Sequence, residues 1–464
     1  MNWLLFSILA YVAMQLIIGF VVTKRIKNES DYLVGGRSLG LGIATMTIFA
    51  TWFGAETCIG ASGAIYEEGL AGGRADPLGY SLCIFGMGIF FAALFWRKGL
   101  TTIADLFRFR FGGASEKIAV LLMVPTSLLW GAAQIRAFGQ ILAASSEMEV
   151  EFAIAVAATI VILYTMMGGI LADAFTDLVQ GIVLVVGLIV TAIVIFANEE
   201  ARGALSTAFE PGRLNLVAPG ETFLDTAESW AVPVFGSIFA QELVSRTLAA
   251  RSPKIARIAC IQAGTLYLFI GFIPVIIGLA GPALLPNLEH SEQLLPRVAQ
   301  TYLPSALYIL FAGALVSAFL STVNSNLLAC AALTSHNFVA PLVGKRDEKF
   351  LLWLTRVLVV AFGLLAYVMA RHAERVYSLV EEASAFGSSG LFVVIVLGLI
   401  TRRGGRITAC ATLITGVVSY VFFNYVYEMS FPFVLSLVAS TVCYLGLMNF
   451  ENFEAPAEPL ASKA

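Results

Sequence analysis

The chain alternates long apolar stretches with short polar connections along its whole length. A helix of about 20 apolar residues is long enough to cross a bilayer. The pattern predicts about thirteen such spans, and helices are the structures that satisfy their own backbone in lipid, so we expect an all-α membrane protein. The predicted spans lie near residues 3–22, 40–65, 77–96, 118–144, 151–169, 174–197, 227–248, 258–281, 304–334, 351–370, 377–400, 406–425 and 430–449.

Composition agrees with this interpretation and excludes several classes of protein. Hydrophobic residues make up 59% of the 464 residues and charged residues 13%, whereas soluble domains carry about 45–50% apolar and about 25% charged residues. A soluble enzyme and a nucleic-acid binder are therefore excluded. Since the sequence also has no Cys-x-x-Cys pair and no nucleotide-binding loop, we expect no enzymatic activity.

The basic residues predict the orientation of the spans, because Lys and Arg are enriched in cytoplasmic connections. With the N-terminus outside, 21 of the 28 basic residues fall inside and 6 outside, and only Arg136 lies deep within a span. We therefore expect a multi-pass protein of the plasma (inner) membrane. It would have one transmembrane domain over residues 1–450 and a short cytoplasmic tail over residues 451–464.

Two of the spans contain residues that disfavour a continuous helix. The second span holds Gly54, Glu56 and Gly60 at mid-depth, and the seventh holds Pro233 and Gly236. In the second span we favour an interrupted helix over close packing through small residues. In the seventh span an interruption and a simple proline kink explain the sequence equally well. Because the two spans lie five apart, their breaks predict an inverted repeat of five plus five helices with the substrate site between them.

Polar side chains inside other spans mark further candidate sites, since such groups are costly in lipid. At the start of the sixth span, Asp173 is explained as a helix cap, whereas Asp177 lies one turn deeper and needs an ion or a hydroxyl partner. Hydroxyls in membrane helices often bond back to their own helix. The ninth span, however, concentrates hydroxyls at helical spacing beside two asparagines, which favours a site for a small cation such as Na⁺. This stripe consists of Ser317, Ser321, Ser325, Ala318 and Thr322.

Taken together, these segments resemble the sodium/solute symporter family from about residue 31 onward. The most specific match is the hinge of spans five and six, with Gly168, Gly169, Thr176, Asp177 and Gln180. Asp173 departs from the family pattern, which generally has an apolar residue there. The resemblance implies a fold of the leucine-transporter type with two broken helices, and sodium-coupled symport.

The resemblance also implies where sodium would bind. The common sodium site of the family uses two carbonyls of the broken first core helix and an Ala-x-x-Ser-Ser/Thr run. The matching residues are Ala50, Phe53, Ala318, Ser321 and Thr322. Some members bind a second sodium through the signature aspartate and further hydroxyls, and the matching positions include Asp177, Ser325 and Asn324. Asn324 replaces a hydroxyl in that set.

The motifs around the substrate position are most similar to those of choline-transporter-like members of the family. Trp52, Tyr80 and Trp130 match aromatic residues that cage a quaternary ammonium by cation–π attraction. The two tryptophans could instead serve as packing or interface anchors. Ala240 stands where the family cage has another tryptophan. Further candidate substrate-binding residues at the two breaks are Glu56, Thr57, Gln241 and Glu242.

Several alternatives stay open at this point. Glu56 could balance a substrate cation or form a bridge with Arg136, and Glu381, Glu382 and Ser384 could face either the site or the outer vestibule. We expect a secondary-active symporter that imports a small polar organic solute, such as an amino acid, a betaine or a choline-like amine, with Na⁺. Its partners would be the solute, Na⁺ and the lipid bilayer, with no nucleic acid and no obligate protein partner. The alternatives are a transporter-like sensor or receptor subunit, and a symporter coupled to protons through Glu56 or Asp177.

Overall fold

The computed structural model describes residues 29–451 apart from 145, 147, 209, 344–347, 374–375 and 402, together with scattered positions before residue 22. In this part of the chain the regular elements are helices, and the β-type pairing is one isolated bridge between Leu39 and Ala250. The predicted all-α class is therefore confirmed. The predicted first span (3–22) and tail (451–464) lie largely outside the described residues.

The predicted spans from the second onward fall on helical structure. Among the described residues, eight helical stretches are long and apolar enough to cross a membrane: Ala75–Arg97, Gly113–Ala143, Gly169–Ala197, Pro253–Leu284, Ser305–Val343, Lys349–His372, Ser378–Ile400 and Arg406–Val426. Three shorter apolar helices also coincide with predicted spans, namely Leu41–Trp52, Val150–Met166 and Pro432–Leu447. The number of thirteen crossings stays a prediction.

The second span is interrupted, as its glycines and carboxylate predicted. It consists of α3 (Leu41–Trp52), η2 (Glu56–Gly60) and α4 (Ala61–Glu68). Phe53 leaves the helical conformation with φ −89° and ψ 79°. The next residue is glycine, and a Cβ on Gly54 would lie 2.6 Å from Glu56 Oε2 and 2.9 Å from Thr322 Oγ1, so a larger residue would displace these side chains. The interruption thus allows the backbone to approach α15 closely.

The seventh span is also interrupted rather than simply kinked. It consists of α11 (Phe223–Ala231), η7 (Val232–Gly236) and α12 (Gln241–Ala249), with residues 237–240 as a non-helical connection. A Cβ on Gly236 would lie 2.2 Å from the carbonyl oxygen of Ser384, so the backbone here presses against α18. The two breaks lie in the second and seventh predicted spans, and the internal repeat of five plus five helices stays a prediction.

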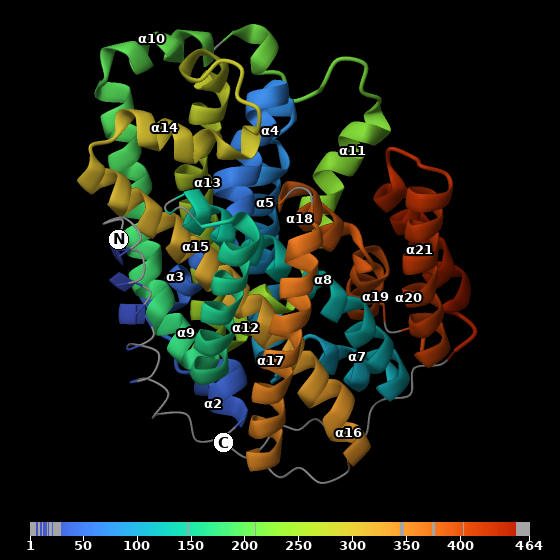
Figure 1. Ribbon diagram of the computed structural model, residues 1–464. Helices are drawn as coiled ribbons and strands as arrows, with labels where there is room; N and C mark the ends of the chain where they lie inside the picture. Colours follow the sequence, from blue (N-terminus) through green and yellow to red (C-terminus); the bar gives the residue numbers. More distant parts are fainter. Residues whose placement is uncertain are drawn as a thin grey trace.

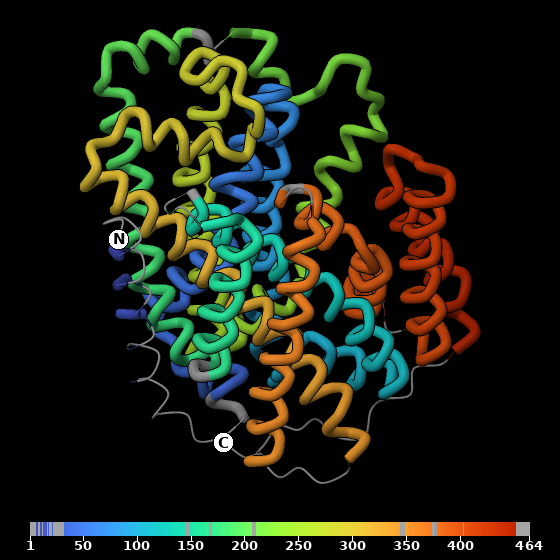
Figure 2. The backbone as a smooth tube through the Cα atoms, viewed as in Figure 1, coloured from blue at the N-terminus to red at the C-terminus, as the bar shows by residue number. Residues whose placement is uncertain are grey.

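Long helices pack around α3, α4 and α12, whereas α11 lies on the other side of the molecule near α21 (Pro432–Leu447), as Figures 1 and 2 show. The longest are α8 (Gly113–Ala144), α9 (Val150–Ala197), α13 (Pro253–Leu284), α15 (Ser305–Ala332) and α17 (Glu348–His372). α9 combines the predicted fifth and sixth spans, which meet at Gly169 with φ 58° and ψ 177°. Tyr32 packs where a side chain on Gly169 would have to lie. A glycine therefore allows this sharp bend.

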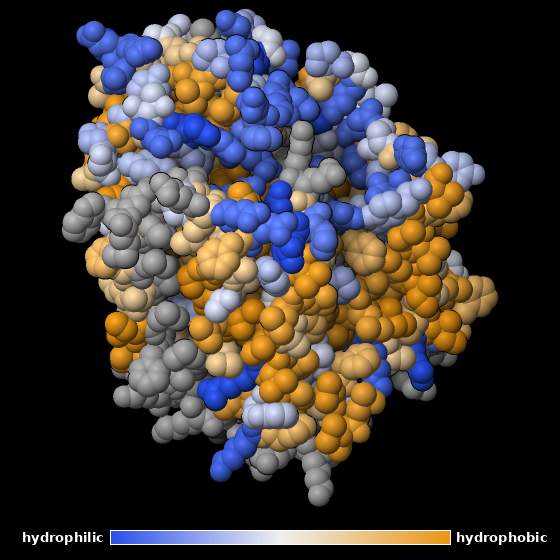
Figure 3. All heavy atoms as spheres, in the orientation of Figure 1, coloured by the Kyte–Doolittle hydropathy of each residue, from blue (hydrophilic) through white to orange (hydrophobic). Residues whose placement is uncertain are grey.

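The remaining helices cover the ends and one side of the molecule. They are α2 (Glu29–Val34), α5 (Tyr80–Gly86), α6 (Ala92–Arg97), α7 (Ala104–Phe111), α10 (Glu199–Ala208), α14 (Leu294–Tyr302), α16 (Ala340–Val343), α18 (Val376–Ala385), α19 (Ser388–Ile400), α20 (Arg406–Val421) and α21 (Pro432–Leu447). Apolar side chains cover the face over α17, α20 and α21, whereas polar ones gather at the end with α10 and α14 (Figure 3). Val442 of α21 is 65% exposed. A broad exposed apolar face suits lipid contact better than contact with water.

Candidate functional site

The end of α3 meets the hydroxyl stripe of α15 in the interior of the protein. The hydroxyl of Thr322 lies 3.5 Å from the carbonyl oxygen of Ala50 and 3.0 Å from that of Ala318. Phe53 stands at the point where α3 ends, and Ser321 lies beside Thr322 on α15. All five of these sequence-predicted residues are buried. The structure thus brings hydroxyl and carbonyl oxygens, which are hard ligands, to the end of a helix, where the last backbone carbonyls lack a partner within the helix itself.

Asp177 of α9 lies next to this position and has hydroxyl partners. Ser321 donates to Asp177 Oδ1 at 2.5 Å, and Thr47 of α3 donates to Oδ2 at 2.5 Å. We expected an ion or a hydroxyl as the partner of Asp177, and the structure shows hydroxyl partners. Because Ser321 belongs to the predicted sodium set, the two predicted ion positions share a side chain.

Asp173, in contrast, does not act as a helix cap. It accepts hydrogen bonds from Arg246 of α12 and Asn324 of α15, and Ser325 approaches at 3.4 Å. The capping interpretation is therefore wrong, because a buried carboxylate pairs with the cationic donor that packing brings to it. From the sequence, Arg246 counts among the basic residues of loops and span ends on the cytoplasmic side, but in the structure it is buried, with only 1% of it exposed. Asn324 and Ser325, predicted for a second ion with Asp177, make their contacts with this pair.

The three predicted aromatic residues form a cluster. The ring centroids are 5.3 Å apart for Trp52 and Trp130, 5.7 Å for Trp52 and Tyr80, and 5.9 Å for Tyr80 and Trp130. All three side chains are buried. The hydroxyl of Tyr80 shares a hydrogen bond with Ser384 of α18 at 3.0 Å. The rings therefore contact one another, and the cluster extends toward α18.

Glu56 is held by α8 at the first residue after the break. Gln134 donates to Glu56 Oε2 at 2.7 Å, and the indole of Trp130 donates to Oε1 at 3.3 Å. Gln134 also accepts a hydrogen bond from the backbone N–H of Ala55 at 2.8 Å. Arg136 instead donates to the carbonyl of Ala370, and the ion pairs of the described residues do not join it to Glu56. The alternative of a Glu56–Arg136 bridge is therefore wrong.

Thr57 points to a different cluster from the aromatic rings. Its hydroxyl donates to Asp76 Oδ2 at 2.8 Å and lies 2.7 Å from the hydroxyl of Tyr267 on α13. Tyr267 also donates to Asp76 at 2.9 Å. The structure thus does not bring Thr57 together with Trp52 and the other predicted substrate residues.

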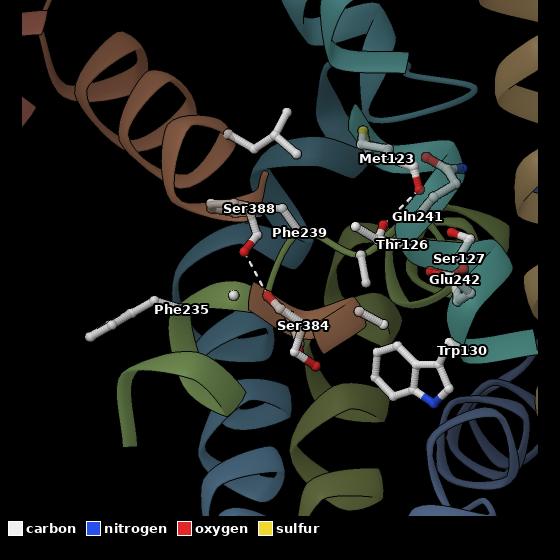
Figure 4. Close-up of a pocket in the computed structure, with 15 residues that line it drawn as sticks. Met123, Thr126, Ser127, Trp130, Phe235, Phe239, Gln241, Glu242, Ser384 and Ser388 are labelled. Carbon is white, nitrogen blue, oxygen red and sulfur yellow. Dashed lines mark hydrogen bonds between the residues drawn. The ribbon is translucent and has the colours of Figure 1, made fainter. Parts of the chain in front are cut away.

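A narrow pocket lies at the break of the seventh span (Figure 4). Its lining combines aromatic, hydroxyl and acidic side chains, among them Ser127, Trp130, Phe239, Ala240, Gln241, Glu242, Ser384 and Ser388. Glu242, which lies beside Ser127 in Figure 4, is 5% exposed, and its Oε1 has no hydrogen-bond partner among the described residues. Gln241 accepts a hydrogen bond from the backbone N–H of Ile103 at 2.9 Å, which ties this break to the connection before α7. Trp130 joins this pocket to the aromatic cluster.

A wider polar cleft of about 350 Å³ opens between α4, α11 and α18. Its lining includes Glu67, Glu68, Arg74, Glu292 and Glu381. Arg74 donates to Glu221 in the neighbouring loop, and this hydrogen bond lowers the pKa of Glu221. Of the three polar residues of α18 left open by the sequence, Glu381 lines this cleft, Ser384 lines the pocket at the break, and Glu382 accepts a hydrogen bond from Tyr425.

A further polar cluster, apart from the two breaks, surrounds Asp105 at the start of α7. The carboxylate accepts hydrogen bonds from the backbone N–H groups of Thr101 and Thr102 and from Asn337. His336 Nε2 lies 3.5 Å away. Burial by itself would raise the pKa of Asp105, but the contact with His336 and the two backbone donors hold it at about 2. Sequence reasoning missed this cluster, because its members come from separate elements.

Arg246 is the main site residue that sequence reasoning missed. A signal was available, because Arg246 lies in a predicted span four residues after Glu242, and Asp173 departs from the family pattern. An arginine inside one predicted span and an unexpected aspartate at the start of another are candidates for a pair. Nothing in the linear sequence, however, indicated that residues 73 positions apart would meet.

An apolar helical bundle with two interrupted helices, oxygen ligands at one break and a pocket at the other defines a secondary transporter. The family model for the sodium:solute symporter family matches residues 32–416, and the chain belongs to this family. The human high affinity choline transporter 1 is 26% identical over 506 residues, covering 97% of this chain and 86% of the relative. The sodium/pantothenate symporter of Haemophilus influenzae is 26% identical over 449 residues, covering 92% of each chain.

The high-affinity choline transporter 1 of Drosophila melanogaster is 28% identical over 367 residues. The match covers 76% of this chain and spans 59% of the length of the fly protein. The family and these relatives are transporters, not enzymes, so the predicted family and the expected lack of enzymatic activity are confirmed.

Solved structures share the fold. A Na⁺-coupled sialic acid symporter in a substrate-bound outward-open state superimposes with a TM-score of 0.85 at 18% identity, over 99% of both chains. A nucleobase-cation-symport-1 family transporter in a closed conformation gives a TM-score of 0.63 at 15% identity, over 91% of this chain and 95% of its own. At these identities the likeness establishes the transporter fold alone.

Proposed function

We propose that the protein is a sodium-coupled symporter that imports a small organic solute carrying a positively charged ammonium group, of the choline or betaine kind. The observation that carries this proposal is Glu242. Its buried carboxylate has one oxygen without a hydrogen-bond partner among the described residues, in a pocket with aromatic and hydroxyl walls. A buried, half-satisfied carboxylate is costly unless a cation completes its contacts. Trp130 and Phe239 supply ring faces to which such a cation is attracted.

Sodium would bind at Ala50, Phe53, Ala318, Ser321 and Thr322. The 3.5 Å separation of Thr322 Oγ1 and the Ala50 carbonyl oxygen leaves these oxygens in reach of one small ion. Such an ion would join the broken second span to the ninth span. Because Gly54 lies between this position and Glu56, sodium would also order the backbone that presents Glu56 and Trp52 to the solute.

The solute would lie between the two breaks, with Glu242, Gln241 and Ala240 on one side and the aromatic cluster on the other. Glu56 completes the acidic surroundings of this space. Rocking of one helix bundle against the other would then open the pocket to the cytoplasm. The protein would lie in the plasma (inner) membrane with its N-terminus outside and its tail, residues 451–464, in the cytoplasm.

Two ligands of the same shape, one cationic and one neutral, test whether the positive charge of the solute is needed for binding. In purified protein with Na⁺, choline should raise the unfolding temperature, whereas its neutral isostere 3,3-dimethyl-1-butanol should not. Glycine betaine, proline and pantothenate serve as further probes. Uptake of the active compound into proteoliposomes should require an inward Na⁺ gradient, and an equal K⁺ gradient should not replace it.

The substitution Glu242→Gln should weaken binding of the cationic solute at least tenfold, on the order of the loss of a charged hydrogen bond. Glu381→Gln is the matched control, because Glu381 lines the polar cleft rather than the pocket. Equal effects of the two variants would contradict the proposed substrate contact. Binding with no uptake under any gradient would instead identify a sensor with a transporter fold, and uptake driven by pH alone would identify proton coupling.

A further inference from the structure

A buried arginine lies beside the proposed sodium position. Arg246 of α12 contacts Asp173 of α9 and Ser325 of α15, and its Nε donates to Thr51 of α3 at 3.1 Å. The guanidinium therefore joins the broken helices α3 and α12 to α9 and α15, which lie together in the middle of the molecule (Figure 1). Its 1% exposure means that its charge is balanced inside the protein.

The oxygens around Arg246 are those that a second cation would need. Ser325 and Thr51 are 3.2 Å apart, and both contact the guanidinium. Asp177 Oδ2 lies 4.0 Å from Arg246 Nη2. A hard cation takes about six oxygen ligands at close range. A guanidinium already bound to these oxygens leaves no room for such an ion among them.

The charges of the cluster lead to the same conclusion. Asp173 pairs with Arg246 and also accepts from Asn324. Asp177, in contrast, takes two hydroxyl hydrogens, from Thr47 and Ser321. The positive charge of Arg246 is thus balanced by Asp173, the carboxylate that departs from the family pattern. Asp177 is the second carboxylate of the cluster, and Ser321 connects it to the proposed sodium position.

We propose that Arg246 is a tethered cation that stands in place of a second sodium ion, so that one Na⁺ accompanies each solute. This inference rests on the proposed sodium symport and specifies its stoichiometry. Asp173 has the role of fixing the guanidinium, and Ser325 and Asn324 hold the pair instead of ligating an ion.

The stoichiometry is measured directly in proteoliposomes from the uptake of ²²Na⁺ and labelled solute by the wild-type protein. The expected ratio is one Na⁺ per solute, with a Hill coefficient near 1 for the Na⁺ dependence of uptake. A ratio of two overturns the inference while leaving the sodium symport intact. An absence of Na⁺ dependence, by contrast, rejects the proposed symport itself, and the inference with it.

Substitutions test whether Arg246 is the reason for the ratio of one Na⁺ per solute. Arg246→Gln frees the oxygens around the guanidinium and leaves Asp173 without its fixed cation, so the Hill coefficient should rise toward 2 and the ratio toward two Na⁺ per solute. The charge-matched double variant Asp173→Asn/Arg246→Gln also removes the carboxylate that would attract a second ion to those oxygens, and should keep a ratio of one. It also serves if the single variant fails to fold. Arg136→Gln is the control arginine, because Arg136 contacts Ala370 outside this cluster. An unchanged ratio of one in a folded Arg246→Gln protein, or a ratio of two in the double variant, overturns the inference.

Discussion

Ser321 donates a hydrogen bond to Asp177 across 2.5 Å, and this bond connects the two ion positions predicted from the sequence. The side chain next to it, Thr322, contacts the carbonyl of Ala50 at the end of α3. Asp177 therefore bears on the sodium position through a single hydroxyl. A change at any of these residues is expected to alter the sodium dependence of transport before it alters the solute pocket.

The first prediction concerns the hydroxyls of α15. Ser321→Ala and Thr322→Ala should each raise the Na⁺ concentration for half-maximal uptake by about tenfold or more, because each removes an oxygen that has no substitute in the buried site. Solute uptake into proteoliposomes at increasing Na⁺ measures this. Ser317→Ala is the matched control on the same helix, since the partners of that hydroxyl are the carbonyl of Gly313 and the hydroxyl of Tyr11 rather than Ala50 or Asp177. Unchanged sodium dependence in both test variants would show that the ion position is assigned wrongly.

The second prediction concerns the close approach at the break of α3. Gly54→Ala would place a methyl group within 2.9 Å of Thr322 Oγ1 and 2.6 Å of Glu56 Oε2. Because the neighbours are held in place by their own hydrogen bonds, the variant should lose Na⁺-dependent uptake and Na⁺-induced thermal stabilisation together. Gly42→Ala on the same helix meets nothing within 4 Å and should behave like the wild type. A fully active Gly54→Ala protein would argue against the tight arrangement of this break.

The third prediction separates the ring of Trp130 from its N–H group. Trp130→Phe keeps an aromatic ring but removes the donor to Glu56, so solute affinity should fall by about threefold to tenfold, the value of one buried hydrogen bond. In a Glu56→Gln background the same substitution should cost less, because the two side chains act as a pair. Solute affinity in the four proteins of this double-mutant cycle is measured by thermal shift. Strictly additive effects would mean that the indole N–H does not support Glu56.

The fourth prediction concerns acid stability and Asp105. Its pKa of about 2 lies below the ordinary aspartate value of 3.8. A carboxylate with a lowered pKa stabilises the folded state above its ordinary pKa, and this stabilisation is lost as the pH falls toward 2. Asp105→Asn should therefore reduce stability by about 2 kcal/mol at neutral pH, and its difference from the wild type should shrink between pH 5 and pH 3.

The unfolding temperature of both proteins in detergent, measured across this pH range, checks the fourth prediction. Glu200→Gln, at an exposed position of α10, provides the control. A pH-independent difference between Asp105→Asn and the wild type would mean that the side chain acts by packing rather than by its charge.

The class of protein and its main landmarks could be predicted because they depend on local properties. Hydropathy over a window of about 20 residues identifies a span. Gly54 disfavours a regular helix, so the interruption of the second span was foreseeable, whereas Pro233 and Gly236 left an interruption and a simple kink of the seventh span equally open. The hydroxyl stripe of α15 follows from helical spacing alone.

Other features could not be predicted, because they depend on which side chains packing brings together. Glu56 meets Gln134 across 78 positions, and Asp173 meets Arg246 across 73. From the sequence, Asp173 resembled a helix cap and Arg246 resembled a cytoplasmic charge at the end of a span, since each interpretation considered one helix only. Buried charges are compensated by neighbours in space, and the neighbours in space come from other helices.

By itself, then, the sequence determined an apolar helical bundle with one interrupted span, a second span that breaks or kinks, and a stripe of hydroxyl oxygens, since each is a property of a single segment. The tertiary structure alone decided that Glu56 pairs with α8, that Glu242 keeps a free oxygen in the pocket among the described residues, and that Arg246 lies within the ion cluster. The reason is physical. A polar group in a membrane protein must find its partner within the fold, and that partner is set by the packing of helices rather than by their order along the chain.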